Sequence, residues 1–538
     1  MKKLIVMLVC LSAYGSYSQD ILWEKSFGGQ KAEYLFDVIP TPDYGFILAG
    51  SSISGKGGTK SDEGKGNFDY WIWKMNEKGD AEWQKSFGGS NDDFLQSIHL
   101  TSDGGFILGG TSNSGNDGDK REGCKGETDF WIVKLNAKGA EQWQKTIGGT
   151  SIERLYSISQ TRDGGYIVGG SSYSDKSPVD AKGKEDLFGK SERNRGNLDY
   201  WLVKLTPEGK VEWQKTYGGD YIDEIRAVEQ TSDGGYLVGG YSNSPKSGDK
   251  TVDRFGLGDY WILRLDNKGA VVWQKAIGGD KDDSLFAMKQ TKDGGFILGG
   301  NSDSGAVNSK LKINAKGIDY WVVKCNDKGE ILWQETYDFG KLDVLTSIIE
   351  NEDGTFLIGG YAQSEKKQDF SKGKISGSDK EGINDYVALK ISSTGEALWS
   401  KTVGSKGDEV MRKLIETRDG GYVLAGTSNG DKSRDKDSKV GDNDFWIVKL
   451  KDRVKPKKIR KEFEAMPNPA TSYTNAVVNF EYDHGEVTLF DLSGRLLKTI
   501  AINGERTVPV ELGNLPQGIY IINVKTNKGE HALKVIKN

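Results

Sequence analysis

Seven carboxylates of this sequence stand at equivalent positions, each a few residues after a turn that is usually glycine-rich. Carboxylate oxygens are ligands that hard cations such as Ca²⁺ prefer, so a ring of them would form a metal site. The same side chains can accept backbone N–H bonds and order a turn. We favour the second interpretation, because a residue present in every repeat serves a feature that all repeats share. The seven are Glu33, Asp93, Glu153, Asp223, Asp283, Asp343 and Glu409.

Three residues after each carboxylate, the residue type changes from repeat to repeat. A specific ligand is expected where the repeats differ, because the shared residues serve the shared fold. Aromatic and guanidinium groups there would bind a glycan or an anionic group by stacking and charge. Variable positions that only face solvent would look the same. These candidate binding residues are Phe36, Gln96, Tyr156, Arg226, Phe286, Thr346 and Arg412.

Histidine is almost absent, which limits the enzyme classes open to this chain. Only His99 lies among the repeats, so a histidine triad or multi-histidine metal site is excluded there. A pair of carboxylates needs no histidine, and a polysaccharide hydrolase or lyase therefore stays as an alternative. The acidic segments 435–437 and 442–444 miss the EF-hand spacing. No cofactor is predicted, and calcium is left open.

The composition argues against nucleic acid as a partner and favours an all-β chain. The 538 residues carry a net charge of -5, without a broad basic surface. The 72 glycines and 10 prolines show no Gly-X-Y period and are typical of many short turns between strands. Only Cys124 and Cys325 lie beyond residue 18, so no disulfide framework is predicted.

The N-terminus has the layout of a secretory signal peptide over residues 1–18. Two lysines precede the apolar run Leu4 to Leu11, and a small polar segment ends at Ser18. That run is too short to cross a bilayer, and no other stretch approaches the roughly 20 apolar residues required. We therefore expect export and no transmembrane segment.

Three sequence markers occur seven times each, which predicts seven structural repeats within residues 19–450. The first is the tryptophan of Trp-x-Lys or, once, Trp-x-Glu, at Trp23, Trp83, Trp143, Trp213, Trp273, Trp333 and Trp399. The second is a turn aspartate at Asp43, Asp103, Asp163, Asp233, Asp293, Asp353 and Asp419. The third is an aspartate before an aromatic residue, at Asp69, Asp129, Asp199, Asp259, Asp319, Asp385 and Asp444. The regular recurrence of tryptophan favours packing between repeats over sugar stacking.

Each repeat contains four short segments rich in β-branched and aromatic residues, separated by turn residues. In the second repeat they are Ser97–Thr101, Phe106–Gly109, Phe130–Leu135 and Glu141–Ile147. This pattern predicts an all-β, seven-bladed β-propeller of four-stranded blades.

The two ends of the repeat region are out of phase, which predicts how the ring closes. The chain begins with a lone strand of the fourth type, Ile21–Phe27, and the last repeat stops after its third strand, Phe445–Leu450. We expect these two strands to pair, because pairing removes an open sheet edge. The N-terminal strand would thus complete the last blade.

The repeats resemble the SBBP-type β-propeller repeats of secreted bacterial proteins. The resemblance rests on Gly88-Gly89, Asp92-Asp93, Asp103-Gly104, Gly110-Thr111 and the Asp129 to Lys134 spacing, and extends over 21–450. It implies a propeller fold and export, and it implies no particular activity.

The composition changes past Leu450. Residues 451–464 contain a basic run that we expect to be a solvated linker. Residues 465–538 alternate short strand patterns with turns, which predicts a small antiparallel β-sandwich. They carry Pro467-Asn468-Pro469-Ala470, the segment Leu489 to Arg495, and Leu515 to Tyr520.

These three motifs resemble the type A sorting domain of the Bacteroidota type IX secretion system. The resemblance implies passage through the periplasm and outer membrane, with the secretion machinery as a partner. Removal of the domain would then leave the protein secreted or attached to the outer cell surface.

The leading functional hypothesis is a non-catalytic binding or adhesion module for an extracellular glycan or protein. The face with the loops between second and third strands is the best candidate surface, and its longest loops are 171–198 and 361–384. The polysaccharide-active enzyme and a purely structural surface component are the alternatives.

Overall fold

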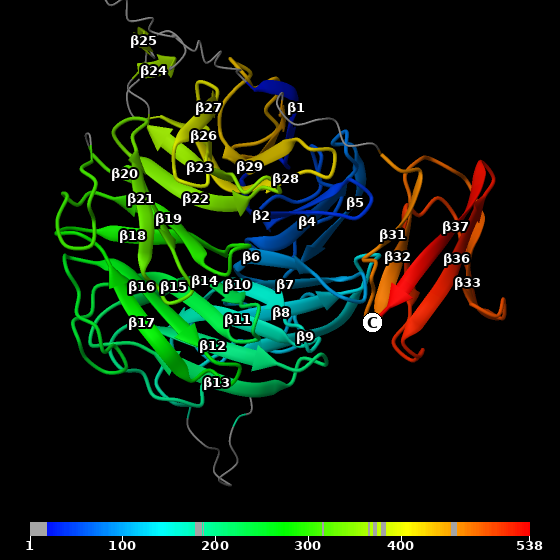
Figure 1. Cartoon of the computed structure of the whole chain (residues 1–538), viewed down its shortest axis with the longest axis horizontal. Coiled ribbons are helices and arrows are strands. Elements are labelled where there is room, and N and C mark those ends of the chain that lie inside the picture. Colours follow the sequence, from blue (N-terminus) through cyan, green and yellow to red (C-terminus); the bar gives the residue numbers. More distant parts are fainter. Residues whose placement is uncertain are drawn as a thin grey trace, which may run out of the picture.

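The structure is a computed structural model that describes residues 19–177, 186, 188–314, 317–363, 366–369, 374–377, 383–452 and 460–538. The predicted signal peptide, half of the basic linker and parts of the two longest loops lie outside these residues. The chain folds as seven four-stranded antiparallel sheets around a common centre, with a smaller domain beside them (Figure 1). Within the described ranges, no helix is long and apolar enough to span a membrane.

Each blade is a meander of four strands. The first strands are β2 (Glu33–Pro40), β6 (Asp93–Leu100), β10 (Glu153–Gln160), β14 (Asp223–Gln230), β18 (Asp283–Gln290), β22 (Asp343–Glu350) and β28 (Glu409–Glu416). The second strands are β3 (Phe46–Ser52), β7 (Phe106–Ser112), β11 (Tyr166–Ser172), β15 (Tyr236–Ser242), β19 (Phe296–Ser302), β23 (Phe356–Gln363) and β29 (Tyr422–Ser428). The third strands are β4 (Asp69–Met75), β8 (Asp129–Leu135), β12 (Asp199–Leu205), β16 (Asp259–Leu265), β20 (Asp319–Cys325), β26 (Asn384–Ile391) and β30 (Asp444–Lys451). The fourth are β5 (Ala81–Phe87), β9 (Glu141–Ile147), β13 (Val211–Tyr217), β17 (Val271–Ile277), β21 (Ile331–Tyr337), β27 (Ala397–Val403) and, last, β1 (Asp20–Phe27). A short hairpin, β24 (Lys366–Asp369) and β25 (Lys374–Gly377), lies in the sixth blade's long loop.

The first strands form a closed inner ring, in which each contacts its neighbours and β28 contacts β2. The predicted closure is confirmed, because β1 pairs with β30. Trp446 lies opposite Ser26 and Lys449 opposite Trp23, as Trp131 lies opposite Thr146 and Lys134 opposite Trp143 in the second blade. The seventh blade is therefore built from both ends of the repeat region.

Aromatic packing joins the blades. The Tyr70 ring lies 4.6 Å from the Trp131 ring of the next blade, and its hydroxyl donates to the Trp131 carbonyl at 2.9 Å. The same contact crosses the closure seam, where the Phe445 and Trp71 rings are 4.8 Å apart. Because the tryptophans of the third strands are buried in these contacts, they stabilise the ring.

The turn aspartates pair with a lysine or arginine of the third strand in every blade. Lys74 and Asp43 form such a pair at 3.0 Å, with both side chains buried. The turn aspartate and the third-strand cation must meet at one end of the sheet. This requirement explains why the distance in sequence between the turn aspartate and the third strand is similar in most repeats.

The first strands begin earlier than predicted. The second blade's first strand runs over Asp93–Leu100 and not Ser97–Thr101, and its pairing with β7 shifts register between Leu95 and Ser97. A β-bulge at Gln96 interrupts the alternation of buried and exposed residues, so the sequence pattern revealed only part of the strand.

The C-terminal domain is a sandwich of two antiparallel sheets, as predicted. One sheet contains β31 (Phe463–Met466), β32 (Tyr473–Val478) and β35 (Thr507–Glu511). The other contains β34 (Leu496–Ile502), β33 (Gly485–Asp491), β36 (Gly518–Thr526) and β37 (Gly529–Lys537). Val510, Val487 and Ile522 are among the buried side chains of its separate core.

Candidate functional site beside the central channel

The seven variable positions all lie at β-bulges of the innermost strands. In each blade the pairing of the first and second strands shifts register across this residue. Bulges re-aim side chains, and the ring turns these strands towards its centre. The variable residues are therefore neighbours in space, although 60 or more positions separate them in sequence.

Three of them form one cluster. The Arg226 guanidinium lies 4.8 Å from the Tyr156 ring centre and 5.2 Å from the Phe286 ring centre. Arg226 also donates to Glu224 at 2.6 Å, and the Tyr156 hydroxyl donates to the same carboxylate. Burial, reinforced by Glu224, raises the pKa of Tyr156 well above its usual range, so this hydroxyl stays a donor.

A second pair forms at the closure seam. The Arg412 guanidinium lies 5.5 Å from the Phe36 ring centre, and its side chain is exposed to solvent. Thr346 donates to the Met411 carbonyl at 3.1 Å. Gln96 is half-buried at its own bulge.

A pocket of 360 Å³ opens beside the Arg226 cluster, between the fourth and fifth blades. Both hydrogen-bond donors and acceptors line it, among them Glu224, Arg226, Tyr241, Asp282, Asn301 and Asp303. The Oδ1 atom of Asn301 is buried and has no hydrogen-bond partner. The pocket thus offers an acceptor that a ligand hydroxyl would satisfy. Of these residues, only Arg226 is identified from the sequence. Asn301 could have been found by the same criterion, because none of the other repeats has asparagine at the equivalent position.

The seven repeated carboxylates are fully buried and do not line the channel mouth. Each accepts a backbone N–H from the preceding turn, as Asp223 does from Gly219 at 2.7 Å. The equivalent bonds reach Glu33, Asp93, Glu153, Asp283, Asp343 and Glu409 at 2.6 to 2.9 Å.

Each of these carboxylates faces the third-strand aspartate of the preceding blade. In six blades a buried lysine lies near both the first-strand carboxylate and the third-strand aspartate. These lysines are Lys60, Lys120, Lys190, Lys250, Lys310 and Lys436. We call this arrangement the charge belt. Burial lowers the pKa of Lys190 to about 8 and raises the pKa of Asp199 to about 7.

Carboxyl groups with a raised pKa, among the residues that the structure describes, all belong to the charge belt. Burial is the main cause of these raised pKa values. Within the described ranges, no pair of carboxyl groups with a raised pKa lies outside the sevenfold sets. Asp338 joins Asp319 and Asp343 in a group whose oxygen atoms lie within 4.8 Å of one another. Of these three residues, only Asp343 is among the candidate metal ligands named from the sequence.

The charge belt predicts that stability falls as pH rises from about 5 to 8. The folded belt holds protons that the unfolded chain has released, with a pKa of about 7 for Asp199 and about 8 for Asp343, so raising the pH favours unfolding. His99 titrates in the opposite direction within this range, and Lys190, whose pKa burial lowers to about 8, does so mainly above pH 8, so the raised carboxyl groups dominate between pH 5 and 8. Melting temperatures measured from pH 5 to 8 should decrease, and Asp199→Asn should flatten the decrease. A rising or flat profile for the unsubstituted chain would contradict this assignment.

Comparison with known proteins identifies the smaller domain. Residues 464–538 match the family described as the secretion system C-terminal sorting domain. The chain therefore carries a sorting domain. This finding confirms the resemblance seen in the motifs, and it indicates export by type IX secretion.

The chain is also similar to other proteins at lower identity. A regulatory protein, FlaEY, from Caulobacter vibrioides is 25% identical over 349 residues, which are 61% of this chain and 35% of that protein. The chain thus spans about a third of that relative's length. The WD40 domain of Neurospora crassa Pan2 shares 10% identity and a TM-score of 0.42, covering 82% of this chain and 99% of that one. Sqt1 from Chaetomium thermophilum shares 11% identity and a TM-score of 0.39, covering 78% and 88%.

Proposed function

We propose that this protein is an exported, non-catalytic binding module that recognises an extracellular glycan beside its central channel. The observation that carries the proposal is the 360 Å³ pocket next to Arg226, in which the buried acceptor of Asn301 has no partner. A volume of this size suits one or two sugar units. Mixed donors and acceptors suit a polyhydroxylated ligand better than an apolar one.

Arg226 would supply N–H donors at a fixed position at the edge of the pocket. Its guanidinium is held between the Tyr156 and Phe286 rings and fixed by Glu224, so little side-chain entropy is lost when a ligand binds. Glu224, Asp282 and Asp303 would accept hydroxyl groups of the ligand. In this proposal these groups position a ligand by accepting its hydroxyl hydrogen bonds.

The location of the pocket agrees with export. The loops between second and third strands and the connections between blades lie on one face of the ring, which we call the loop face. The pocket lies on this face, where Asp282 and Asp303 belong to such connections. Blade hairpins on the opposite face, the turn face, carry the contacts with the sorting domain. The pocket would therefore be open both before and after removal of that domain, at the cell surface or in the medium.

A glycan array tests the proposal. The whole chain should bind a defined set of glycans, and Arg226→Ala or Asn301→Leu should each weaken binding by about tenfold or more, since each removes a buried polar contact. Arg162→Ala, on the turn face, is the control and should bind normally. Binding that both pocket variants retain would place the ligand elsewhere.

A further inference from the structure

The first repeat departs from the others at one turn residue. In the other six repeats a glycine with positive φ occupies this position, at Gly104, Gly164, Gly234, Gly294, Gly354 and Gly420. The first repeat has Tyr44 there, with φ 67°. An aromatic residue rarely adopts this left-handed conformation, and it persists where surrounding contacts hold it.

The contacts that hold Tyr44 come from two distant parts of the chain. Its ring centre lies 4.3 Å from the Arg418 guanidinium of blade seven and 5.2 Å from that of Arg460, just before the sorting domain. Its hydroxyl donates to Glu464 on β31 at 3.4 Å. Tyr44 is 7% exposed, so the ring and the sorting domain together bury it.

Arg418 places this contact across the closure seam. It donates to the Pro42 carbonyl of blade one and forms an ion pair with Glu464 of the sorting domain. Glu464 therefore contacts blade seven through Arg418 and blade one through Tyr44. Both blades must stand side by side for this surface to exist.

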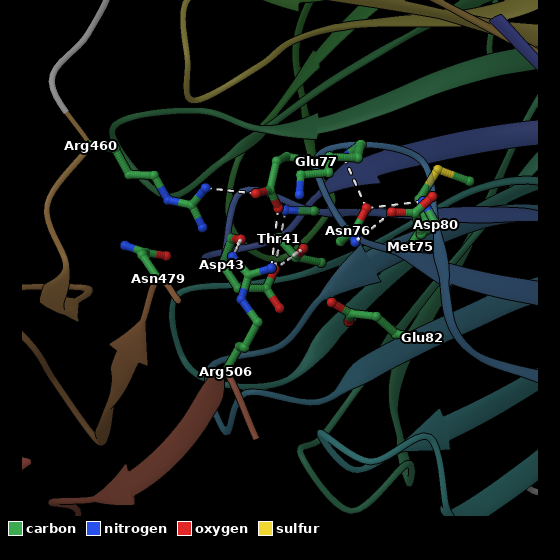
Figure 2. A network of polar contacts seen from close by, with 12 residues as sticks. Thr41, Asp43, Met75, Asn76, Glu77, Asp80, Glu82, Arg460, Asn479 and Arg506 are labelled. Atoms are coloured by element: carbon green, nitrogen blue, oxygen red, sulfur yellow. Dashed lines mark hydrogen bonds and ion pairs between the residues drawn. The ribbon is translucent and has the colours of Figure 1, made fainter. Parts of the chain in front are cut away.

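Two more arginines extend the surface over blade one. Arg460 and Arg506 converge on Glu77 at 2.6 and 3.1 Å (Figure 2). Arg506 also donates to the Asp43 carbonyl at 3.0 Å.

Among the residues that the structure describes, the contacts with the sorting domain fall on a few blades. A Cβ atom added to Gly104 of blade two would lie 3.1 Å from Asn475 and 3.2 Å from Pro509 of the sorting domain. At the equivalent Gly234, Gly294 and Gly354, an added Cβ would meet nothing within 4 Å. Blades seven, one and two thus carry the contact.

We propose that the sorting domain docks on a surface that only the closed ring presents, with Tyr44 as its anchor. A ring that has not closed lacks the Arg418 side of this surface, so the sorting domain would stay undocked. Docking would then distinguish a folded passenger from an open chain. The turn itself needs only glycine, as the other six repeats show. We therefore assign the strained Tyr44 to the contact with the sorting domain.

Disulfide trapping in the full chain tests the docked position. The Cβ atoms of Gly104→Cys and Pro509→Cys would lie near 3.4 Å apart, close to the separation that a disulfide needs. Mild oxidation should link them, as seen on a non-reducing gel. The pair Gly234→Cys and Pro509→Cys should stay unlinked, and equal linking of both pairs would contradict docking at this place.

Substitutions in the linked pair test the anchor and the seam. Tyr44→Gly should slow disulfide formation by about tenfold, because a cation–π contact and a hydrogen bond are lost, yet it should not lower the melting temperature of the ring. Arg418→Ala should slow it similarly, whereas the matched Arg162→Ala, which removes a comparable contact between blades three and four, should not. Normal linking in both Tyr44→Gly and Arg418→Ala would overturn the proposal, and so would equal slowing by Arg162→Ala.

Discussion

A chain that lacks residues 19–29 should aggregate or unfold at a much lower temperature than the chain from residue 19. The deletion removes β1, which leaves the backbone edge of β30 unpaired and exposes Trp446 and Phe445. Truncation of one buried phenylalanine alone costs about 3–5 kcal/mol, and the deletion removes Phe27 together with a whole strand. Size-exclusion chromatography and thermal unfolding measure the effect.

Deletion of residues 1–18 alone is the control, and it should leave the unfolding transition intact. A monodisperse chain without residues 19–29 that melts at the control temperature would contradict closure by the N-terminal strand.

Deletion of residues 465–538 should retain a folded propeller in the periplasm. The sorting domain has its own core, separate from the clusters that hold the blades together, so the ring does not depend on it for folding. Without that domain the secretion machinery has no signal to engage. We expect a nearly complete loss of surface and extracellular protein, with protease-resistant propeller in the periplasmic fraction.

Cell fractionation with antibodies against the ring provides the measurement. Delivery of the shortened chain to the surface at the level of the full chain would show that residues 465–538 are not the export signal. A shortened chain that is degraded in the periplasm would show that the ring needs the domain for stability.

The sequence predicts the ring because each blade repeats the same packing problem. Trp131 recurs at its position since it packs on the preceding blade, and Asp103 keeps its spacing since it pairs with Lys134. The sequence also predicts ring closure. The N-terminal strand β1 is of the fourth type, and it can complete only the blade that lacks a fourth strand.

The pocket beside Arg226 could not be predicted from the sequence pattern alone. The bulge positions could be identified as variable, but which of them meet depends on the curvature of the ring. Arg226 lies between Tyr156 and Phe286 because three consecutive blades bring their bulges together. Asn301 lies on a second strand of the next blade, and only the folded ring brings it into the pocket that Arg226 lines.

The docking surface shows the same limit. Tyr44 visibly breaks the glycine pattern, yet its partner Glu464 lies 420 positions away. No local signal connects the two residues, since the contact depends on ring closure and on the path of the chain after β30.

The most direct test of the central claim is native mass spectrometry of the protein with an oligosaccharide selected from the glycan array. We expect a complex whose mass equals the protein plus one intact oligosaccharide, and we expect Arg226→Ala to show mostly free protein under the same conditions. An oligosaccharide that is shortened during incubation would show catalysis, and an undiminished complex with Arg226→Ala would show that the ligand does not occupy the pocket beside the channel.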